Sequence, residues 1–251
     1  MPELVGSYLL EVSSRLDALA AEADAGALDG AVDLIAAAIE AGGVVQAFGT
    51  GHSEAFAMEI AGRAGGLIPT NKIALRDVVL RGSRNAGELK GSSLERDPAV
   101  VEELFDLSPV GEQDVFIIAS NSGVNGSIVG LALLAKSRGH RLIAVTSLEH
   151  TAAVEPKHPS GLRLSEIADV VIDNKAPFGD TTLELPGGGG VGAVSSITAA
   201  FIAQLLTIGT AERIGATGKV PPIYISANIP GGDEHNQVLE DLYKNRIRRD
   251  A

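Results

Sequence analysis

The chain has 251 residues, of which 45% are hydrophobic and 21% are charged, as in a folded protein with a sizeable core. Its formal charge of −12 argues against nucleic acid as a partner, and the absence of cysteine excludes disulfides and thiolate metal sites. No apolar run approaches the roughly eighteen residues of a membrane span, and residues 1–20 lack the basic start of a secretory leader. We therefore expect a cytoplasmic protein.

Two helices are predicted at the N-terminus. Apolar residues recur at three- and four-residue steps from Glu3 to Glu22, which predicts a helix with one apolar face. Residues Ala31–Ala41 predict a second helix, which ends at Gly42 and Gly43.

The middle of the chain alternates short apolar runs with helical patterns. The runs predict strands at Val44–Phe48, Asp114–Ala119, Arg141–Thr146 and Ala168–Asp173. Helical patterns extend from Ser53 to about Ala64 and from about Asn125 to Ser137. Continuous apolar strands separated by helices indicate a parallel sheet that is covered on both faces, so the predicted fold is α/β and doubly wound.

Four stretches depart from this rhythm. Val78–Asp97 is polar and contains glycine, and loops of this length are usually functional or disordered. Leu148–Gly161 is a second excursion. The sequence ELPGGGG precedes a long apolar helix, and NIPGGDEHN feeds a short terminal helix. No repeat and no linker divides the chain.

The first turn that could carry chemistry follows the first predicted strand. It contains Gly49, Thr50, Gly51, His52 and Ser53. The first backbone N–H groups of a helix have no partner within the helix, and glycine lets an anion approach them closely. The alternative is structural, since glycine permits a tight turn and serine can cap a helix.

The second turn has the same chemistry. It contains Ser120, Asn121, Ser122, Gly123 and Asn125, and it also lies between a strand and a helix. Two such turns at the carboxyl ends of parallel strands could hold one ligand between them. Neither turn matches a P-loop or a complete dinucleotide fingerprint, so nucleotide binding is weakly supported.

Several basic residues and histidines remain open. Arg76, Arg81, Arg84 and Lys90 could close over a phosphate, or they could belong to a solvated loop. His235 follows a glycine turn and could enter a site, including that of a neighbouring subunit, or it could be an exposed residue at a helix start. His140 has no expected chemical role, and His150 and His158 are left without an assignment.

Three blocks of the sequence resemble the sugar isomerase (SIS) domain. They are FGTGHSEAFAMEIAGRAGGL, IASNSGVNGSIVGLALLAKSRGHRLIAVTS and LSEIADVVID, in this order and at similar spacing, from about Gly43 to Ile214. The resemblance implies a flavodoxin-like three-layer sandwich around a five-stranded parallel sheet. It is nearest to the phosphoheptose isomerase-like branch and to related uncharacterised SIS proteins.

The resemblance also implies an organisation of the chain. The N-terminal helices, residues 1–42, are expected to belong to the domain and to form a homodimer or homotetramer. Residues 43–214 are expected to form the phosphosugar-binding domain, and residues 215–251 a C-terminal extension. The expected partner is a small phosphosugar, with no nucleic acid and no membrane.

Site residues carry over by position. In SIS domains the second turn receives the sugar phosphate, and Ser53 matches a serine of the first turn that contacts the same ligand. Glu59 stands where phosphoheptose isomerases have a metal-binding histidine, and Arg63 where they have a glutamate. The late helix, Val191–Gln204, has no histidine or glutamate, which argues against the zinc-dependent reaction. We therefore expect no metal and no cofactor.

The expected activity is aldose–ketose isomerisation of a phosphosugar, or a related lyase or etherase reaction. Glu59 is the candidate base, because a partly buried carboxylate can be poised for proton transfer, although it could instead be exposed or paired with Arg63. His52 and His235 are the further catalytic candidates. The alternatives are a phosphosugar sensor without catalysis and an interaction protein.

Overall fold

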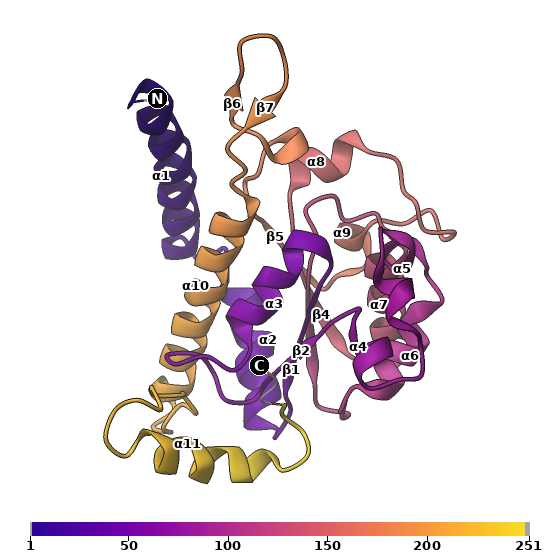
Figure 1. Cartoon of the computed structure of the whole chain (residues 1–251). Coiled ribbons are helices and arrows are strands. Elements are labelled where there is room, and N and C mark those ends of the chain that lie inside the picture. Colours follow the sequence, from indigo (N-terminus) through magenta and orange to yellow (C-terminus); the bar gives the residue numbers. More distant parts are fainter. Residues whose placement is uncertain (1, 249–251) are drawn as a thin grey trace.

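A five-stranded sheet forms the centre of the computed structural model, which describes residues 2–248 (Figure 1). The strand order is β2-β1-β3-β4-β5, and all four pairings are parallel. The strands are β1 Val45–Gly49, β2 Thr70–Ile73, β3 Val115–Ala119, β4 Arg141–Thr146 and β5 Val170–Asp173. This order is the flavodoxin-like one, so the predicted α/β fold is confirmed.

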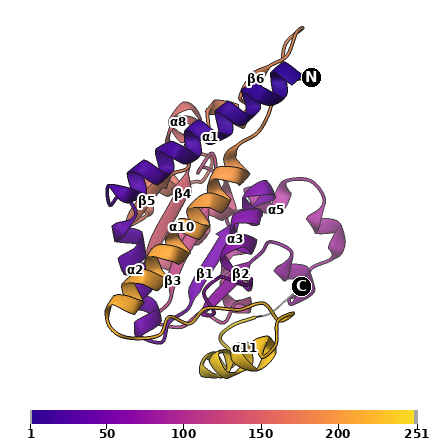
Figure 2. The ribbon, with the colours of Figure 1, turned by 90° about the vertical axis from the view of Figure 1, so that its left-hand side faces the viewer.

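Helices cover both faces of the sheet. One face carries α2 (Asp29–Glu40), α3 (Glu54–Ile60) and α10 (Ser195–Ala216), with α1 (Pro2–Asp24) lying on α10 (Figure 2). The other face carries α4 (Asp77–Leu80), α5 (Ser93–Arg96), α6 (Val100–Leu107), α7 (Gly126–Ser137) and α9 (Leu164–Ile167). This arrangement leaves the carboxyl ends of the strands as the edge where the loops gather.

Two hydrophobic cores lie on opposite sides of the sheet because side chains alternate along each strand. Ala47 and Ile117 point into the core beneath α2, α3 and α10. Phe48 and Phe116 point into the core beneath α6 and α7. Since both faces are covered, the central strands β1 and β3 are buried throughout, which explains their largely apolar sequences. The buried polar residue of β1, Gln46, donates to Asp114 at 2.8 Å.

The edge strand β2 was not predicted from the residues themselves. Its sequence, TNKI, has no apolar run, yet Thr70 and Asn71 are buried. The side chain of Asn71 explains this, because its amide donates to the carbonyl of Arg246 at 2.5 Å and accepts from the backbone N–H of Arg248 at 2.8 Å. The polar strand is thus covered by a distant segment of the chain.

Several boundaries differ from the predicted ones. The helix expected to reach about Ala64 ends at Ile60, because Ala61 is extended and Gly62 has a φ of +71°. The stretch Val78–Asp97 is not a plain loop, since it contains most of α4 and the single turn α5. The second excursion contains α8 (Leu148–Ala153), and the glycine-rich stretch forms the hairpin β6 (Leu183–Glu184) and β7 (Gly190–Val191).

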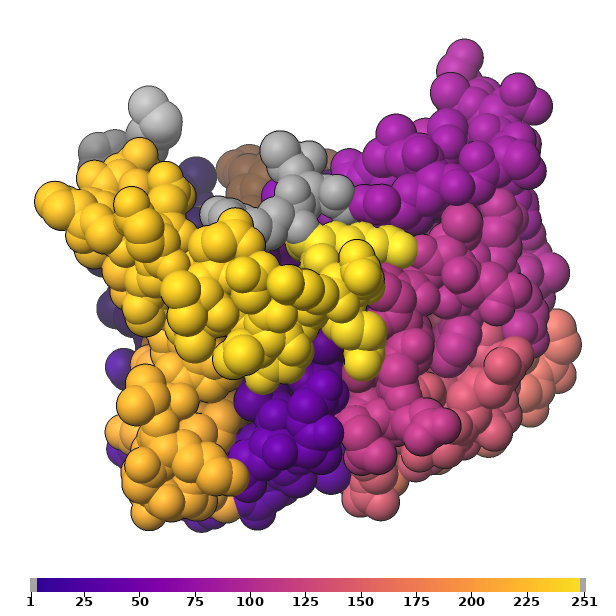
Figure 3. Space-filling view, turned by 90° about the horizontal axis from the view of Figure 1, so that it is seen from below, coloured from indigo at the N-terminus to yellow at the C-terminus, as the bar shows by residue number. Residues whose placement is uncertain are grey.

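The C-terminal segment lies across the end of the molecule opposite these loops. In Figure 3 its yellow residues, which include α11 (Gly232–Glu240), run from the end of α10 toward the magenta middle of the chain. Arg246 makes an ion pair of 2.5 Å with Asp114, whose side chain is fully buried. This contact fastens the described end of the segment to the sheet.

By length and composition, α10 is apolar enough to cross a membrane. It packs against α2, α3 and α1, and its buried residues belong to the core shared with the sheet. We therefore describe α10 as the long core helix of this domain.

Candidate functional site

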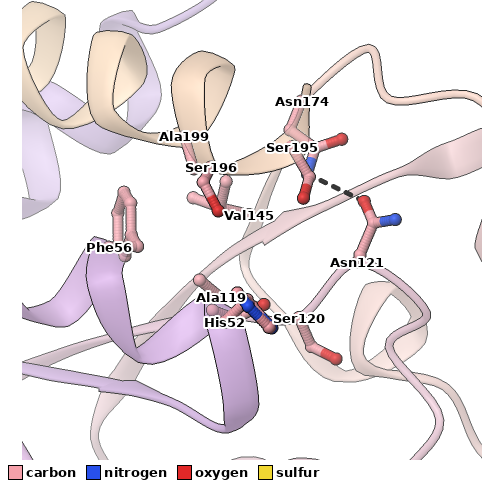
Figure 4. Close-up of a pocket in the computed structure, with 11 residues that line it drawn as sticks. His52, Phe56, Ala119, Ser120, Asn121, Val145, Asn174, Ser195, Ser196 and Ala199 are labelled. Carbon is pink, nitrogen blue, oxygen red and sulfur yellow. Dashed lines mark hydrogen bonds between the residues drawn. The ribbon is translucent and has the colours of Figure 1, made fainter. Parts of the chain in front are cut away.

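Both predicted turns line one pocket at the carboxyl ends of the strands. Figure 4 shows His52 from the first turn together with Ser120 and Asn121 from the second. The remaining lining residues are Ser53 and Phe56 near the start of α3, Ala119, Val145, Asn174, and Ser195, Ser196 and Ala199 at the start of α10. The space between these side chains, open solvent included, is about 280 Å³.

The first turn is shaped by a close backbone approach. A Cβ on Gly49 would lie 2.2 Å from the carbonyl oxygen of Ser53, so only glycine fits at the end of β1. Ser53 occupies the cap position of α3, but its side chain makes no capping hydrogen bond. Ser53 therefore does not cap the helix through its side chain, which was the alternative role for this serine. Its hydroxyl remains available at the pocket.

The second turn is held by its own side chains. Ser120 Oγ accepts from the backbone N–H of Gly123 at 3.1 Å, and Gly123 has a φ of +64°. Asn125 precedes α7 in an extended conformation and makes no capping hydrogen bond either. Ser122 is half-buried in the same turn. Residues Ser122, Gly123 and Asn125 do not line the open pocket.

A glutamate that was not predicted occupies the space between the two turns. The Oε1 atom of Glu95 accepts from the Asn125 amide at 2.6 Å and from the Thr50 hydroxyl at 3.1 Å. Ser127 Oγ donates to the carbonyl of Glu95 at 2.8 Å. A Cβ on Gly126 would lie 2.1 Å from the carbonyl oxygen of Arg96, so α5 packs directly on the start of α7. Nothing in the sequence distinguished Glu95 from the other polar residues of its loop.

A chain of amide groups connects the pocket to α8. Asn174 Nδ2 donates to Asn121 Oδ1 at 3.1 Å, and Asn121 Nδ2 lies 3.2 Å from His150 Nδ1. Asn174 is 3% exposed and follows β5 directly. It could have been found from the sequence, because it is the polar residue at the carboxyl end of a predicted strand.

The start of α10 is fixed by Asp180, a second residue that was not predicted. Its Oδ1 accepts from the backbone N–H of Val194 and Ser195 at 3.1 and 2.9 Å, and its Oδ2 accepts from Ser195 Oγ at 2.5 Å. Asp180 therefore supplies the N-terminal hydrogen bonds of this helix and holds Ser195 at the pocket wall.

Glu59, the predicted base, lies one turn beyond Phe56 on α3 and does not line the pocket. Its carboxylate, 23% exposed, forms an ion pair with Arg63, which is the alternative that the sequence left open. The same oxygen accepts a hydrogen bond of 2.6 Å from Gln204 of α10. The late helix thus contributes an amide to Glu59.

The other two catalytic candidates are far apart. His52 is exposed at the rim of the pocket. His235 is exposed on α11, with Nε2 3.0 Å from the carbonyl of Ile223, near the opposite end of α10 from the pocket. Within one chain, the structure therefore does not bring these two histidines together.

Three of the four basic residues that could close over a phosphate, Arg76, Arg81 and Arg84, lie beside acids. Arg76 pairs with Glu54, and Arg84 pairs with Glu103 at 2.6 Å and with Glu88 at 3.5 Å. The hydrogen bond that Arg84 donates to Glu103 raises the pKa of Arg84, although desolvation works against the shift. Arg81 lies 3.8 Å from Asp77, and Lys90 is exposed. Among residues 2–248 no cluster of histidine and carboxylate side chains could hold a metal ion.

Comparisons with known proteins decide the family. The model of the SIS domain matches residues 7–147, which is more than half of the chain. The chain belongs to the SIS domain family. The predicted recognition is thus confirmed.

Curated relatives of this SIS protein match between 86% and 98% of its length. A UPF0309 protein of Geobacillus thermodenitrificans is 34% identical over 249 residues, which are 97% of this chain and 96% of that one. A UPF0309 protein of Brucella canis is 36% identical over 251 residues, 98% of either chain. A UPF0309 protein of Listeria monocytogenes is 38% identical over 218 residues, 86% of this chain and 88% of its own.

Solved structures share the fold of this SIS protein at low identity. A phosphoheptose isomerase from Francisella tularensis superposes with a TM-score of 0.51 at 17% identity, covering 84% of this chain and 98% of its own. The protein c3406 of E. coli CFT073 gives a TM-score of 0.52 at 15% identity, covering 85% and 90%. At these identities the likeness establishes the architecture.

Proposed function

We propose that this SIS protein binds a phosphosugar between its two turns and interconverts the aldose and ketose forms. The observation that carries the proposal is that His52 and Ser53 of one turn line the same pocket as Ser120 and Asn121 of the other. Membership of the SIS family and a fold neighbour that is a phosphoheptose isomerase support the choice of ligand and reaction.

The phosphate is assigned to the start of α7 and the surrounding hydroxyl groups. The N-terminus of this twelve-residue helix offers backbone N–H groups and the positive end of its dipole. The residues assigned to phosphate binding are Gly49, Thr50, Gly51 and Ser53 of the first turn and Ser120, Asn121, Ser122, Gly123 and Asn125 of the second. Of these, Ser53, Ser120 and Asn121 line the open pocket. The Asn125 amide already donates a hydrogen bond to the Glu95 carboxylate, so a phosphate that binds this amide has to displace the carboxylate of Glu95.

The sugar is assigned to the polar part of the pocket. Asn121, Asn174, Ser195 and Ser196 provide neutral amide and hydroxyl groups. Such groups match the hydroxyl groups of a sugar, which both donate and accept hydrogen bonds. Their neutrality fits a division of the site into a phosphate end and a sugar end.

The reaction needs a base that removes the proton from C2 of the open-chain aldose and returns it to C1. The electrons of the broken C2–H bond form the C1–C2 double bond of an enediol, and the O2 proton moves to O1, so no oxidant or cofactor is consumed. We assign Glu59 as this base, His52 as the group that opens the ring, and His235 as a residue supplied by a neighbouring subunit. Gln204 of α10 donates a hydrogen bond of 2.6 Å to the Glu59 carboxylate. Glu59 lies one turn beyond the pocket-lining Phe56, so this role requires the carboxylate to turn toward the bound sugar.

A second candidate function is phosphosugar binding without turnover. It is favoured by the ion pair of Glu59 with Arg63 and by a pocket lining without a carboxylate. In this arrangement the Glu59 carboxylate already has two partners, the Arg63 guanidinium and the Gln204 amide.

The experiment uses aldose phosphates labelled with ¹³C at C1 and follows them by NMR in the presence of the protein. Isomerisation converts the C1 signal of the aldose into that of a ketose CH₂OH group. Binding without this conversion would replace the isomerase by the sensor. Absence of both binding and conversion for pentose, hexose, heptose and amino-sugar phosphates would overturn both functions.

We also propose that the protein is cytoplasmic and assembles as a homodimer or homotetramer. Support for assembly comes from α1, where apolar side chains are exposed on the described surface. They are Leu4, Val5, Leu9 and Leu10, exposed by between 42% and 70%. Exposed apolar residues gathered on one helix are typical of a surface that another subunit covers.

A further inference from the structure

A chain of hydrogen bonds behind the pocket starts at a donor whose direction is fixed. The backbone N–H of Ala176 donates to a side-chain atom of Asn174 at 3.0 Å, and this atom must be the carbonyl oxygen Oδ1. The NH₂ group of Asn174 therefore lies at the other end of its amide. It donates to Asn121 Oδ1 at 3.1 Å (Figure 4).

The same logic fixes the next two groups. Because Oδ1 of Asn121 accepts from Asn174, its NH₂ group is the part that faces His150 Nδ1, at 3.2 Å. An amide NH₂ group donates and has no acceptor site. His150 Nδ1 must then be an unprotonated acceptor, so the imidazole is neutral and carries its proton on Nε2.

The helix that carries His150 is also fixed in place. Ser147 Oγ accepts from the backbone N–H of His150 at 3.0 Å and donates to the carbonyl of Ala176 at 2.6 Å. The ring of Phe178 meets the imidazole edge-on, with the centroids 5.2 Å apart. His150 is therefore held in place by three contacts: its backbone N–H with Ser147, its Nδ1 atom with Asn121, and its ring with Phe178.

We propose that His150 is a hydrogen-bond donor to the bound sugar, with Nε2–H as the donating group and the amide chain as the device that keeps the ring neutral. The proposal rests on the proposed function. Asn121 and Asn174 line the pocket. His150 is not among the lining residues, and its place beside them follows from its contact with Asn121 and from the strand order, because Asn121, His150 and Asn174 follow the neighbouring strands β3, β4 and β5. In the described part of the chain, Nε2 of the half-buried His150 has no hydrogen-bond partner.

The chemistry of this donor selects the part of the ligand that it meets. A neutral N–H suits a hydroxyl or carbonyl oxygen, whereas a phosphate is better held by cations or by several backbone N–H groups. The charged groups near α8 have other partners. Glu149 accepts from the backbone N–H of Phe178, Asp173 pairs with Lys175, and Arg163 donates to the carbonyls of Thr151 and Val154.

The first test observes the tautomer directly. Protein labelled with ¹⁵N in its histidines is examined by long-range ¹H–¹⁵N NMR near neutral pH, and the His150 signals are assigned by their loss in His150→Gln. The proposal expects the Nε2–H tautomer. An imidazolium ion or an Nδ1–H tautomer for His150 in the unliganded protein would overturn it.

A variant of the chain provides a second readout. Asn121→Asp replaces the NH₂ group by a carboxylate oxygen that can only accept, so His150 must now carry a proton on Nδ1. Asn228→Asp is the matched control, because Asn228 is exposed and outside this chain of hydrogen bonds. The His150 spectrum should change in the first variant and not in the second; an unchanged spectrum in Asn121→Asp would contradict the proposed chain.

The ligand role is tested by affinity. His150→Ala should weaken binding of the preferred phosphosugar about tenfold, since one hydrogen bond contributes about 1.4 kcal/mol, and should leave binding of inorganic phosphate unchanged. Equal losses for both ligands, or none, would show that His150 does not meet the sugar. If wild-type protein binds no phosphosugar, the proposed function fails together with this role of His150, whereas the tautomer result stands by itself.

Discussion

The carboxylate of Glu95 accepts a 2.6 Å hydrogen bond from the side-chain amide of Asn125, and the same oxygen accepts a 3.1 Å bond from Thr50. Thr50 and Asn125 belong to the two turns that were predicted to hold one anion. In this structure the anion between them is supplied by the protein itself. A phosphate that binds the Asn125 amide must therefore compete with Glu95, because two negative groups that share one hydrogen-bond donor lie close enough to repel each other.

Glu95→Gln is accordingly expected to tighten the binding of inorganic phosphate and of phosphosugars. The glutamine removes the competing charge and keeps the size of the side chain. We expect about a tenfold gain, since hydrogen bonds to a charged group are stronger than those to a neutral one by about 1 kcal/mol or more. Isothermal titration of both proteins measures the difference.

The matched control for that experiment is Glu102→Gln. Glu102 is exposed on α6 and forms a surface ion pair of 3.5 Å with Arg138. Its substitution therefore removes the same charge without changing a residue that contacts the two turns. If both variants gain alike, the effect is one of net charge. Weaker phosphate binding in Glu95→Gln would show that Glu95 belongs to the binding site and is not a competitor.

Glu59→Gln should abolish isomerisation and leave phosphosugar affinity within about twofold. Glutamine can still accept from Gln204 but cannot take a proton at neutral pH. Turnover is measured with the ¹³C-labelled substrate, and affinity by titration. Turnover that survives this substitution would remove Glu59 from the mechanism.

Asp114 is expected to be a centre of stability. Its fully buried carboxylate accepts from the backbone N–H of Val44 at 2.8 Å and of Gly111 at 2.9 Å, and it pairs with Arg246. Asp114→Ala leaves these groups without their acceptor and should lower the free energy of unfolding by about 3 kcal/mol or more. Urea denaturation measures the change.

A surface ion pair supplies the comparison. Lys219 pairs with Glu40 at 2.7 Å, and its side chain is 60% exposed, so Lys219→Ala should change the free energy of unfolding by less than about 1 kcal/mol. A similar loss in both variants would contradict the importance assigned to the buried carboxylate.

Asp169 should make stability depend on pH in the acid range. Burial by itself raises the pKa of Asp169, but hydrogen bonds from Lys136 and the backbone of Leu142, together with the charges of Lys136 and Arg141, lower it overall. Because its folded pKa is the lower one, Asp169 stabilises the protein above its unfolded pKa of about 4 and loses this effect as pH falls through the folded value.

The test compares wild type with Asp169→Asn by urea denaturation at several pH values. We expect wild type to be more stable by about 1 kcal/mol at neutral pH, with the difference shrinking below about pH 4. A difference that is constant over this range would mean that the carboxylate charge contributes nothing.

The exposed apolar side of α1 should mediate assembly. Wild-type protein is expected to be a dimer or tetramer at micromolar concentration by light scattering. Leu9→Glu with Leu10→Glu should reduce it to a monomer, because two charges would have to be buried between subunits. A wild-type monomer would contradict this expectation.

Patterns along the chain predicted the part of the fold that depends on local chemistry. Strands β3 and β4 are recognisable as apolar runs because both faces of the sheet are covered. The glycine at position 49 is required by a backbone contact with Ser53, only four residues away. Strand β2 carries no such signal, since the polar Asn71 is satisfied by Arg246 and Arg248, more than 170 residues away.

The site shows the same division. Ser53, Ser120 and Asn121 could be predicted, because they stand at the ends of apolar strands or at helix starts. Glu95 and Asp180 could not, since each is brought to the site by a loop whose course depends on tertiary packing. The role proposed for His150 depends on the direction of the hydrogen bonds that join Asn174, Asn121 and His150, and no sequence pattern shows this direction.

The central claim is that the two turns bind a sugar through its phosphate, and thermal denaturation with a ligand panel tests it most directly. The melting temperature should rise with the logarithm of the concentration for at least one pentose, hexose, heptose or amino-sugar phosphate, because a ligand of the folded state stabilises it by mass action. The same sugar without its phosphate should give a much smaller shift. No shift with any phosphosugar, or equal shifts with and without the phosphate, would contradict the claim.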